Sequence, residues 1–158
     1  MEQQDVLGLV AEFHNTFNHP ILPKPQIPDV GRCKLRVDLI REELKELEDA
    51  ISQKDIVEIA DALCDIQYVL SGAVLEFGMG AKFIDLFNEV HRSNMSKCCE
   101  TEEEAKVAVE DYLKKNGTEC YYAENNNKWL IYRRSDNKTL KSKNYSPANL
   151  KIILESDL

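Results

Sequence analysis

Carboxylate side chains recur at helical spacing in two neighbouring stretches of the chain, residues 41–51 and 56–77. In chain order the six candidates are Glu42, Glu43, Glu46, Glu58, Asp61 and Asp65. Because residues three or four apart share one face of an α-helix, each stretch presents carboxylates on one side. Two such faces opposed across a helix pair would form a cage of oxygens, the ligands that Mg²⁺ and Mn²⁺ prefer.

The second stretch gives the sharper argument for a metal site. Between residues 56 and 77 every charged side chain is acidic, Glu76 included, no Lys or Arg is present, and most other side chains are apolar or small. A helix that is apolar on nearly all sides is expected to be buried. An unpaired buried carboxylate costs on the order of several kcal/mol, which a bound cation would remove. The alternative is that these acids face solvent or pair with a Lys or Arg from elsewhere.

Four helices are needed to position these carboxylates. Apolar residues at helical spacing predict them at residues 3–18, 34–51, 56–77 and from about 83 into 91–97. Four prolines in residues 20–28 predict an extended connector after the first helix. The turn at residues 52–55 is short, so the two acidic helices should be antiparallel and their acids close together. We expect Glu48 and Asp49 to point away into solvent.

Length and composition limit the fold class and the kinds of partner. The 158 residues, 43% hydrophobic and 30% charged, are typical of one soluble globular domain with a real core. A net charge of −8 argues against a nucleic-acid polymer as the partner. It does not argue against a nucleotide substrate, because a bound metal ion would invert the local charge.

The cysteines and the first residues predict a reducing, cytoplasmic location. Five cysteines, with no C-x-x-C pair, do not suit a disulfide framework. We expect Cys64 to be a small buried hydrophobe, and Cys98 and Cys99 to be incidental thiols rather than a metal or redox pair. The opening MEQQDVLG has no basic region before an apolar run, so no signal peptide is predicted. No apolar stretch is long enough to span a membrane.

After residue 99 the pattern changes to that of a small appendage. Thr101 and Glu104 form a capping box at the start of a helix, and residues 119–124 and 128–134, rich in Tyr, Trp and Ile, predict a β-hairpin. The hairpin aromatics are expected to pack on the helix rather than to stack on a base. The predicted organisation is an all-α bundle at 1–98, a helix–hairpin insertion at 99–138 and a tail at 139–158 that packs back on the bundle.

The segment HRSNMSK at residues 91–97 carries two cations, two hydroxyls and an amide. Such groups suit phosphate and ribose oxygens. The same composition is equally typical of a polar helix C-terminus, whose cations interact favourably with the helix dipole. Local sequence leaves both interpretations open.

Longer motifs add a family resemblance. EELKE at 42–46 followed by EIAD at 58–61 is similar to the EExxE…ExxD pattern of the all-α nucleoside triphosphate pyrophosphohydrolase superfamily, which includes MazG-like proteins and dimeric dUTPases. DALCDIQYV at 61–69, EVHRSNMSK at 89–97 and LKSKNYSPANL at 140–150 resemble its phosphoribosyl-ATP-pyrophosphohydrolase-like branch. The linker between the acid pairs is short for the superfamily, and the tail has KSKNY where relatives more often show KGPNY.

The resemblance implies a mainly α fold, a MazG-like four-helix bundle that cleaves a nucleoside triphosphate to a monophosphate and pyrophosphate. It implies Mg²⁺, or Mn²⁺ as a substitute, held by Glu43, Glu46, Glu58 and Asp61, with Asp65 as a further metal or sugar contact. Glu42 would orient or deprotonate the attacking water. Phosphate and ribose contacts would come from Arg92, Asn94, Lys97 and Lys141. The implied partners are the nucleotide and a second copy of the chain, as a homodimer or dimer of dimers.

The expected function is therefore Mg²⁺-dependent pyrophosphohydrolysis of (d)NTPs, which would suit house-cleaning of the nucleotide pool. One competing interpretation is a non-catalytic helical interaction protein with a solvated acidic face. Another is a di-iron carboxylate bundle, a class that uses Glu-x-x-His motifs. No His lies on the two acidic stretches, which argues against the di-iron class. No residue type in the sequence selects among bases or sugars.

Overall fold

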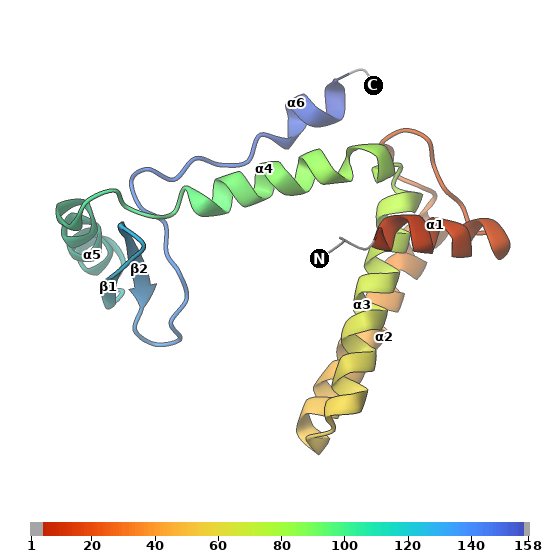
Figure 1. Cartoon of the computed structure of the whole chain (residues 1–158), viewed down its shortest axis with the longest axis horizontal. Helices are drawn as coiled ribbons and strands as arrows, with labels where there is room; N and C mark the ends of the chain where they lie inside the picture. The colour runs from red at the N-terminus through yellow and green to blue at the C-terminus, as the bar shows by residue number, and fades with distance from the viewer. Residues whose placement is uncertain (1–4, 157–158) are drawn as a thin grey trace. The chain divides into compact units, whose positions relative to one another are not determined.

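The computed structural model describes residues 5–156 and is mainly helical with one small β-hairpin, as predicted (Figure 1). The elements are α1 (Val6–Thr16), α2 (Val30–Gln53), α3 (Ile56–Glu76), the 3₁₀ turn η1 (Gly80–Lys82), α4 (Phe83–Met95), α5 (Glu102–Asn116), β1 (Cys120–Asn125), β2 (Lys128–Arg133) and α6 (Leu150–Glu155). The chain forms two compact units that meet in sequence at residues 83 and 84. The predicted domain limits at residues 98 and 138 stay a prediction. None of the described helices is long and apolar enough to cross a bilayer.

An antiparallel hairpin of α2 and α3 dominates the first unit, and α1 packs across α3 (Figure 1). Asp55 caps α3 by accepting hydrogen bonds from the amides of Val57 and Glu58, at 3.0 and 3.2 Å. Lys54, in the left-handed region at φ 57°, ends α2 one residue earlier. The predicted short turn therefore holds the two acidic helices side by side.

The start of α2 is earlier than the predicted residue 34. Asp29 accepts a hydrogen bond from the amide of Arg32 at 3.1 Å, so the helix begins at Val30, directly after the proline-rich connector. The connector is fixed on the end of α3 by two backbone hydrogen bonds. The amide of Leu22 donates to the carbonyl of Leu75, and the amide of Gln26 to that of Phe77, both at 3.1 Å.

A buried polar cluster joins the three helices of the first unit. Glu76 is fully buried and accepts hydrogen bonds from Arg32, at 3.0 Å from its Nε, and from Arg36. Nδ1 of the buried His14 donates to the carbonyl of Pro20 at 3.0 Å. For Glu76 the alternative left open by the sequence is therefore confirmed: its partners are two arginines from elsewhere in the chain, both on α2.

The expected burial of α3 on nearly all sides is also wrong. Ile56, Val57 and Leu63 are 74%, 70% and 52% exposed, and Cys64, expected to be buried, is exposed too. Two neighbouring helices cover only part of the circumference of a third, so the remaining apolar side chains of α3 face outwards. The carboxylates of α3 are consequently not sealed in a core of one chain.

In the second unit, α5 packs on the hairpin of β1 and β2. The core consists of four buried residues, Cys99, Ala105, Cys120 and Ile131. Trp129 packs against this core, as the sequence predicts for the hairpin aromatics. Asn126 and Asn127 form the two-residue turn, with φ of 50° and 59°, which is the conformation that tight hairpins favour.

The C-terminal tail of the second unit runs back along α4 (Figure 1). The amide of Asn149 donates to the Glu89 carboxylate at 2.9 Å, and the amide of Ser146 donates to the Ser96 hydroxyl at 2.8 Å. These contacts join residues 50 and 60 positions apart in the sequence. Hydrogen bonds to the polar C-terminal half of α4 therefore fix the path of the tail.

Candidate functional site

Carboxylates from both helices of the α2–α3 hairpin border one pocket of about 180 Å³. Its lining residues are Glu46, Asp49, Ala50, Gln53, Glu58 and Asp61. Three of the four predicted metal ligands thus meet at this pocket, because the antiparallel pairing sets the end of α2 against the start of α3. The side chains of Glu46, Glu58 and Asp61 are all exposed and can turn toward a ligand.

Glu43, the fourth predicted ligand, occupies the crowded centre of the acid cluster. Its Oε2 atom is buried and has no hydrogen-bond partner. Burial, followed by the charges of Glu46, Asp65, Glu42 and Asp61, raises the pKa of the Glu43 carboxyl. The structure therefore gathers five predicted acids around one another, and none of the five forms an ion pair within residues 5–156.

Two residues of the pocket were not among the predicted ones. Asp49, expected to point away, lines the pocket while it forms an ion pair with Lys45. The Gln53 amide lines it as well. Both follow Glu46 at helical spacing, three and seven positions on, so the periodicity of α2 contains the signal that finds them.

The residue set fits a hard divalent cation in its chemistry. All the charged groups at the pocket are carboxylates, which bind Mg²⁺ and Mn²⁺, and the unpaired Glu43 oxygen is a buried acceptor without a donor. In the described part of the chain, no three His, Cys, Asp or Glu side chains are arranged to hold a metal ion as they stand. Side-chain rotation at the exposed acids would be needed, and the roles of these residues stay predictions.

Among the predicted phosphate contacts, Arg92 is engaged within its own unit. Its guanidinium donates two hydrogen bonds to Glu89, both at 2.8 Å, and one to the carbonyl of Pro147 at 3.1 Å. The hydrogen bonds from Arg92 and from the amide of Asn149 lower the pKa of Glu89 to about 2. Arg92 thus joins α4 to the tail. A phosphate that contacts Arg92 would have to share its guanidinium with Glu89 and the Pro147 carbonyl.

The other three predicted contacts are Asn94, Lys97 and Lys141, of which the two lysines act on Tyr145. Lys97 donates to the side-chain oxygen of Asn94 at 2.9 Å, and the Lys141 ammonium lies 4.2 Å from the centroid of the Tyr145 ring. A hydrogen bond with Ser93 is the main cause that lowers the pKa of Tyr145, and the charges of Lys141 and Lys97 act in the same direction. Two lysines that are distant in sequence therefore act on the same tyrosine of the second unit, and their role as phosphate contacts stays a prediction.

Comparison with known families identifies the chain. The family model of phosphoribosyl-ATP pyrophosphohydrolases (PRA-PH) matches residues 10–94, more than half of the 158 residues. The chain belongs to the phosphoribosyl-ATP pyrophosphohydrolase family. The match includes all six acids of the hairpin and the predicted contacts Arg92 and Asn94. Family membership supports a pyrophosphohydrolase-like fold and a hydrolase that acts on phosphoric anhydrides.

One relative extends the likeness beyond that match, in an alignment of 236 positions that includes long gaps in this chain of 158 residues. Uncharacterized protein L479 of Acanthamoeba polyphaga mimivirus is 27% identical to this phosphoribosyl-ATP pyrophosphohydrolase family member, over 92% of this chain and 94% of its own. Because so little of the chain is left uncovered, the alignment includes most of the segment after residue 94. The likeness to this relative is therefore not confined to the residues that the family model matches.

Proposed function

We propose that this protein is a Mg²⁺-dependent nucleoside triphosphate pyrophosphohydrolase that cleaves (d)NTPs of the cytoplasm to (d)NMPs and pyrophosphate. One observation carries the proposal: the Glu43 carboxylate is partly buried among four other acids, with one oxygen that no donor satisfies. A protein does not gain stability from such an arrangement, so a ligand that is itself positive accounts for it. Membership of the pyrophosphohydrolase family supports the same conclusion.

The proposed ligands of the cation are Glu43 and Glu46 from α2 and Glu58 and Asp61 from α3. When bound, Mg²⁺ neutralises phosphate charge and makes the phosphorus more electrophilic, and Mn²⁺ would substitute. Asp65, half-buried on α3 beside Glu43, is a further candidate for metal or sugar. The four ligands come from both helices, so the short turn at residues 54–55 is essential for their convergence.

Glu42 is the proposed base. It precedes Glu43 on α2, is exposed, and lies close enough to affect the Glu43 charge. In this role its carboxylate orients a water molecule and accepts a proton as the water oxygen bonds to phosphorus. The anhydride bond then breaks and pyrophosphate leaves. Arg92, Asn94, Lys97 and Lys141 are the proposed contacts to phosphate and ribose.

A second copy of the chain is the proposed protein partner. Large apolar side chains of the α2–α3 hairpin are exposed, among them Leu44 at 49%, Ile51 at 56% and Val57 at 70%. Exposed apolar surface of this kind marks an interaction site. A homodimer, or a dimer of dimers, that buries it would also lower the polarity around the carboxylates. Sedimentation or light scattering measures the mass, and a monomer at micromolar concentration would contradict this part of the proposal.

The reaction is tested by measuring pyrophosphate release from a panel of NTPs and dNTPs, with Mg²⁺, with Mn²⁺ and with EDTA. We expect metal-dependent release together with a monophosphate product. Glu46→Gln and Asp61→Asn should each abolish turnover while the helical circular dichroism signal stays unchanged. Glu48→Gln is the matched control, because Glu48 is an exposed acid of α2 that does not line the pocket.

Two outcomes would refute the proposed reaction. Full activity of Glu46→Gln or Asp61→Asn would show that the pocket acids do not hold an essential ion. Absence of release across the panel, with no thermal shift from either metal, would favour the interpretation as a non-catalytic helical interaction protein. In that case Glu58→Ala should leave stability unchanged or higher, because an exposed acid would be removed from a repulsive cluster.

A further inference from the structure

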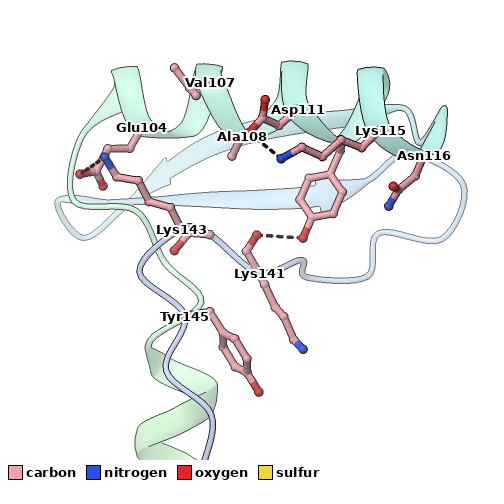
Figure 2. A pocket seen from close by; sticks show the side chains of 11 residues that line it. Glu104, Val107, Ala108, Asp111, Lys115, Asn116, Lys141, Lys143 and Tyr145 are labelled. Atoms are coloured by element: carbon pink, nitrogen blue, oxygen red, sulfur yellow. Dashed lines mark hydrogen bonds and ion pairs between the residues drawn. The ribbon is translucent and has the colours of Figure 1, made fainter.

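A cavity of about 440 Å³ lies in the second unit between α5 and the tail (Figure 2). Figure 2 shows Val107, Ala108 and Lys115 on α5 along one side, and Lys141, Lys143 and Tyr145 of the tail along the other. Ligand pockets for small molecules have volumes of roughly 300–1,000 Å³, so this cavity is large enough for one nucleotide. It lies entirely within one unit, beyond the residues that the family model matches.

The walls of the cavity offer flat and apolar surface. Val107 and Ala108 line it from α5, and two tyrosines line it from α5 and from the tail, Tyr112 and Tyr145. The Tyr112 hydroxyl donates to the backbone carbonyl of Lys141 at 2.9 Å, which fixes its ring between the helix and the tail. Aromatic rings held in this way stack on the planar bases of nucleotides, whichever base is present.

The charges at the rim select an anion. Lys115 pairs with Asp111 and Lys143 with Glu104, each at 3.3 Å, so these two cations are neutralised. The Lys141 ammonium pairs with no carboxylate in the described chain and instead lies 4.2 Å from the Tyr145 ring centroid. A cation so placed next to an aromatic wall is available to a phosphate group.

A further cation stands next to the cavity. Lys97 acts on Tyr145 electrostatically together with Lys141, and among the described residues its ammonium donates to the neutral Asn94 side chain and forms no ion pair. Two lysines that form no ion pair within the described chain therefore act on one tyrosine, in a protein whose net charge is −8. This local reversal of charge is the electrostatic requirement for binding a phosphorylated ligand.

We propose that this cavity is the base-binding part of a nucleotide site on the second unit, with the base against Tyr112 and Tyr145 and the phosphates at Lys141 and Lys97. The inference deepens the proposed function, on which it rests for the class of ligand. It adds that binding does not require the metal, because lysines rather than carboxylates hold the phosphates. An acidic peptide is less suited, because the aromatic walls are those of a compact cavity rather than of an extended groove.

The test is calorimetric titration of the full-length protein with ATP and with UTP, both in EDTA. We expect saturable one-to-one binding of at least one of them. Adenosine or uridine, which lack phosphate, and inorganic pyrophosphate, which lacks a base, should each bind at least about tenfold more weakly, since each loses one set of contacts. The proposal is overturned if neither triphosphate saturates, or if pyrophosphate binds as tightly as the nucleotide, because the cavity would then hold only an anion.

Two variants locate the site. Val107→Trp places an indole in the cavity, and Lys141→Ala removes the free cation; each should weaken binding about tenfold. Leu113→Trp and Lys114→Ala are the matched controls, because both residues are exposed on α5 away from the cavity. Two folded variants that both bind as tightly as their controls would overturn the proposal.

Asp61→Asn separates this inference from the reaction. The variant lacks a proposed metal ligand, so it should lose pyrophosphate release and still bind the nucleotide in EDTA with unchanged affinity. Loss of that binding in a folded Asp61→Asn protein would place the nucleotide at the acid cluster alone, and the cavity would have no role. If the wild-type protein binds in EDTA and never hydrolyses, the proposed reaction fails and the nucleotide site stands.

Discussion

Arg36 and Glu76 form an ion pair inside the first unit, 40 residues apart in sequence and both almost fully buried. Arg32, 27% exposed, donates to the same carboxylate. Burial alone would raise the pKa of Glu76, but the hydrogen bonds from the two arginines outweigh it, and the pKa is lowered. The pair joins the first half of α2 to the last turn of α3, at the opposite end of the hairpin from the acid pocket. The hairpin is therefore fixed at one end by a compensated acid, while at the other end Glu46, Glu58 and Asp61 form no ion pair within the described part of the chain.

Glu76→Ala should strongly destabilise the first unit. Removal of one partner leaves Arg36 buried with an unpaired charge, which costs about 3–5 kcal/mol of the free energy of unfolding. Urea denaturation followed by circular dichroism measures the loss. Asp38→Ala is the control, because Asp38 pairs with Lys34 and Arg41 on the surface, where ion pairs contribute little to stability. Equal losses in the two variants would contradict the structural role of the buried pair.

Glu43→Gln should raise the melting temperature of the metal-free protein. The pKa of Glu43 is raised, so the folded state disfavours the charged carboxylate and loses stability as the pH rises through that pKa. An amide removes the penalty, and a gain of ~1 kcal/mol corresponds to roughly 2–4 °C. The gain should be present at pH 7 in EDTA and shrink as the pH falls below the raised pKa.

The same variant should lose the thermal stabilisation that Mg²⁺ gives the wild-type protein, because a ligand that binds only the folded state stabilises it by mass action. Glu48→Gln, an exposed acid of the same helix, should retain it. A lower melting temperature for Glu43→Gln in EDTA would mean that the Glu43 carboxylate has a favourable partner, and the argument for a cation there would fail.

Glu89→Gln should weaken the attachment of the tail in a pH-dependent way. The pKa of Glu89 is lowered to about 2 by Arg92 and the amide of Asn149, so its stabilising contribution is complete above the ordinary value near 4.5 and disappears as the pH falls toward 2. Hydrogen exchange of the Asn149 amide should be faster in the variant at pH 7, and the difference from wild type should vanish near pH 2. A difference that persists there would show that charge is not the cause.

Gly78→Ala should destabilise the first unit by about 2 kcal/mol or more. Gly78 has φ +69°, and a Cβ there would lie 1.9 Å from the carbonyl oxygen of Lys24, which is backbone and cannot rotate away. Gly117→Ala is the matched control. Its φ is +63°, yet a Cβ would meet no atom within 4 Å, so only the left-handed strain of about 1 kcal/mol remains. Chemical denaturation of both variants gives two losses in the free energy of unfolding. The difference between them is the cost of the clash with the connector backbone at Lys24.

The elements of this protein follow from short-range patterns in its sequence. Asp55 and Thr101 mark the starts of α3 and α5, and each accepts the capping hydrogen bond that its position predicts. The two asparagines at 126–127 give the tight hairpin turn. Such features depend on groups within four residues of one another, which is why the helices and the hairpin could be predicted within a few residues. The carboxylate periodicity of α2 and α3 is also a short-range pattern, and the motifs that resemble a known family could be found from it without the fold.

Tertiary structure alone decided which charges have partners. The sequence placed Glu76 in the same acid series as Glu58 and Asp61, yet α2 supplies Glu76 with two arginines, whereas Glu58 and Asp61 form no ion pair within the described residues. It decided that Lys141 lies beside Tyr145 and pairs with no carboxylate of the described chain, whereas Lys143 is neutralised by Glu104. It also left much of α3 exposed, against the expectation from its composition. The periodicity of a helix determines the face on which a side chain lies. The free energy of burying its charge depends instead on whether a segment tens of residues away places a partner beside it.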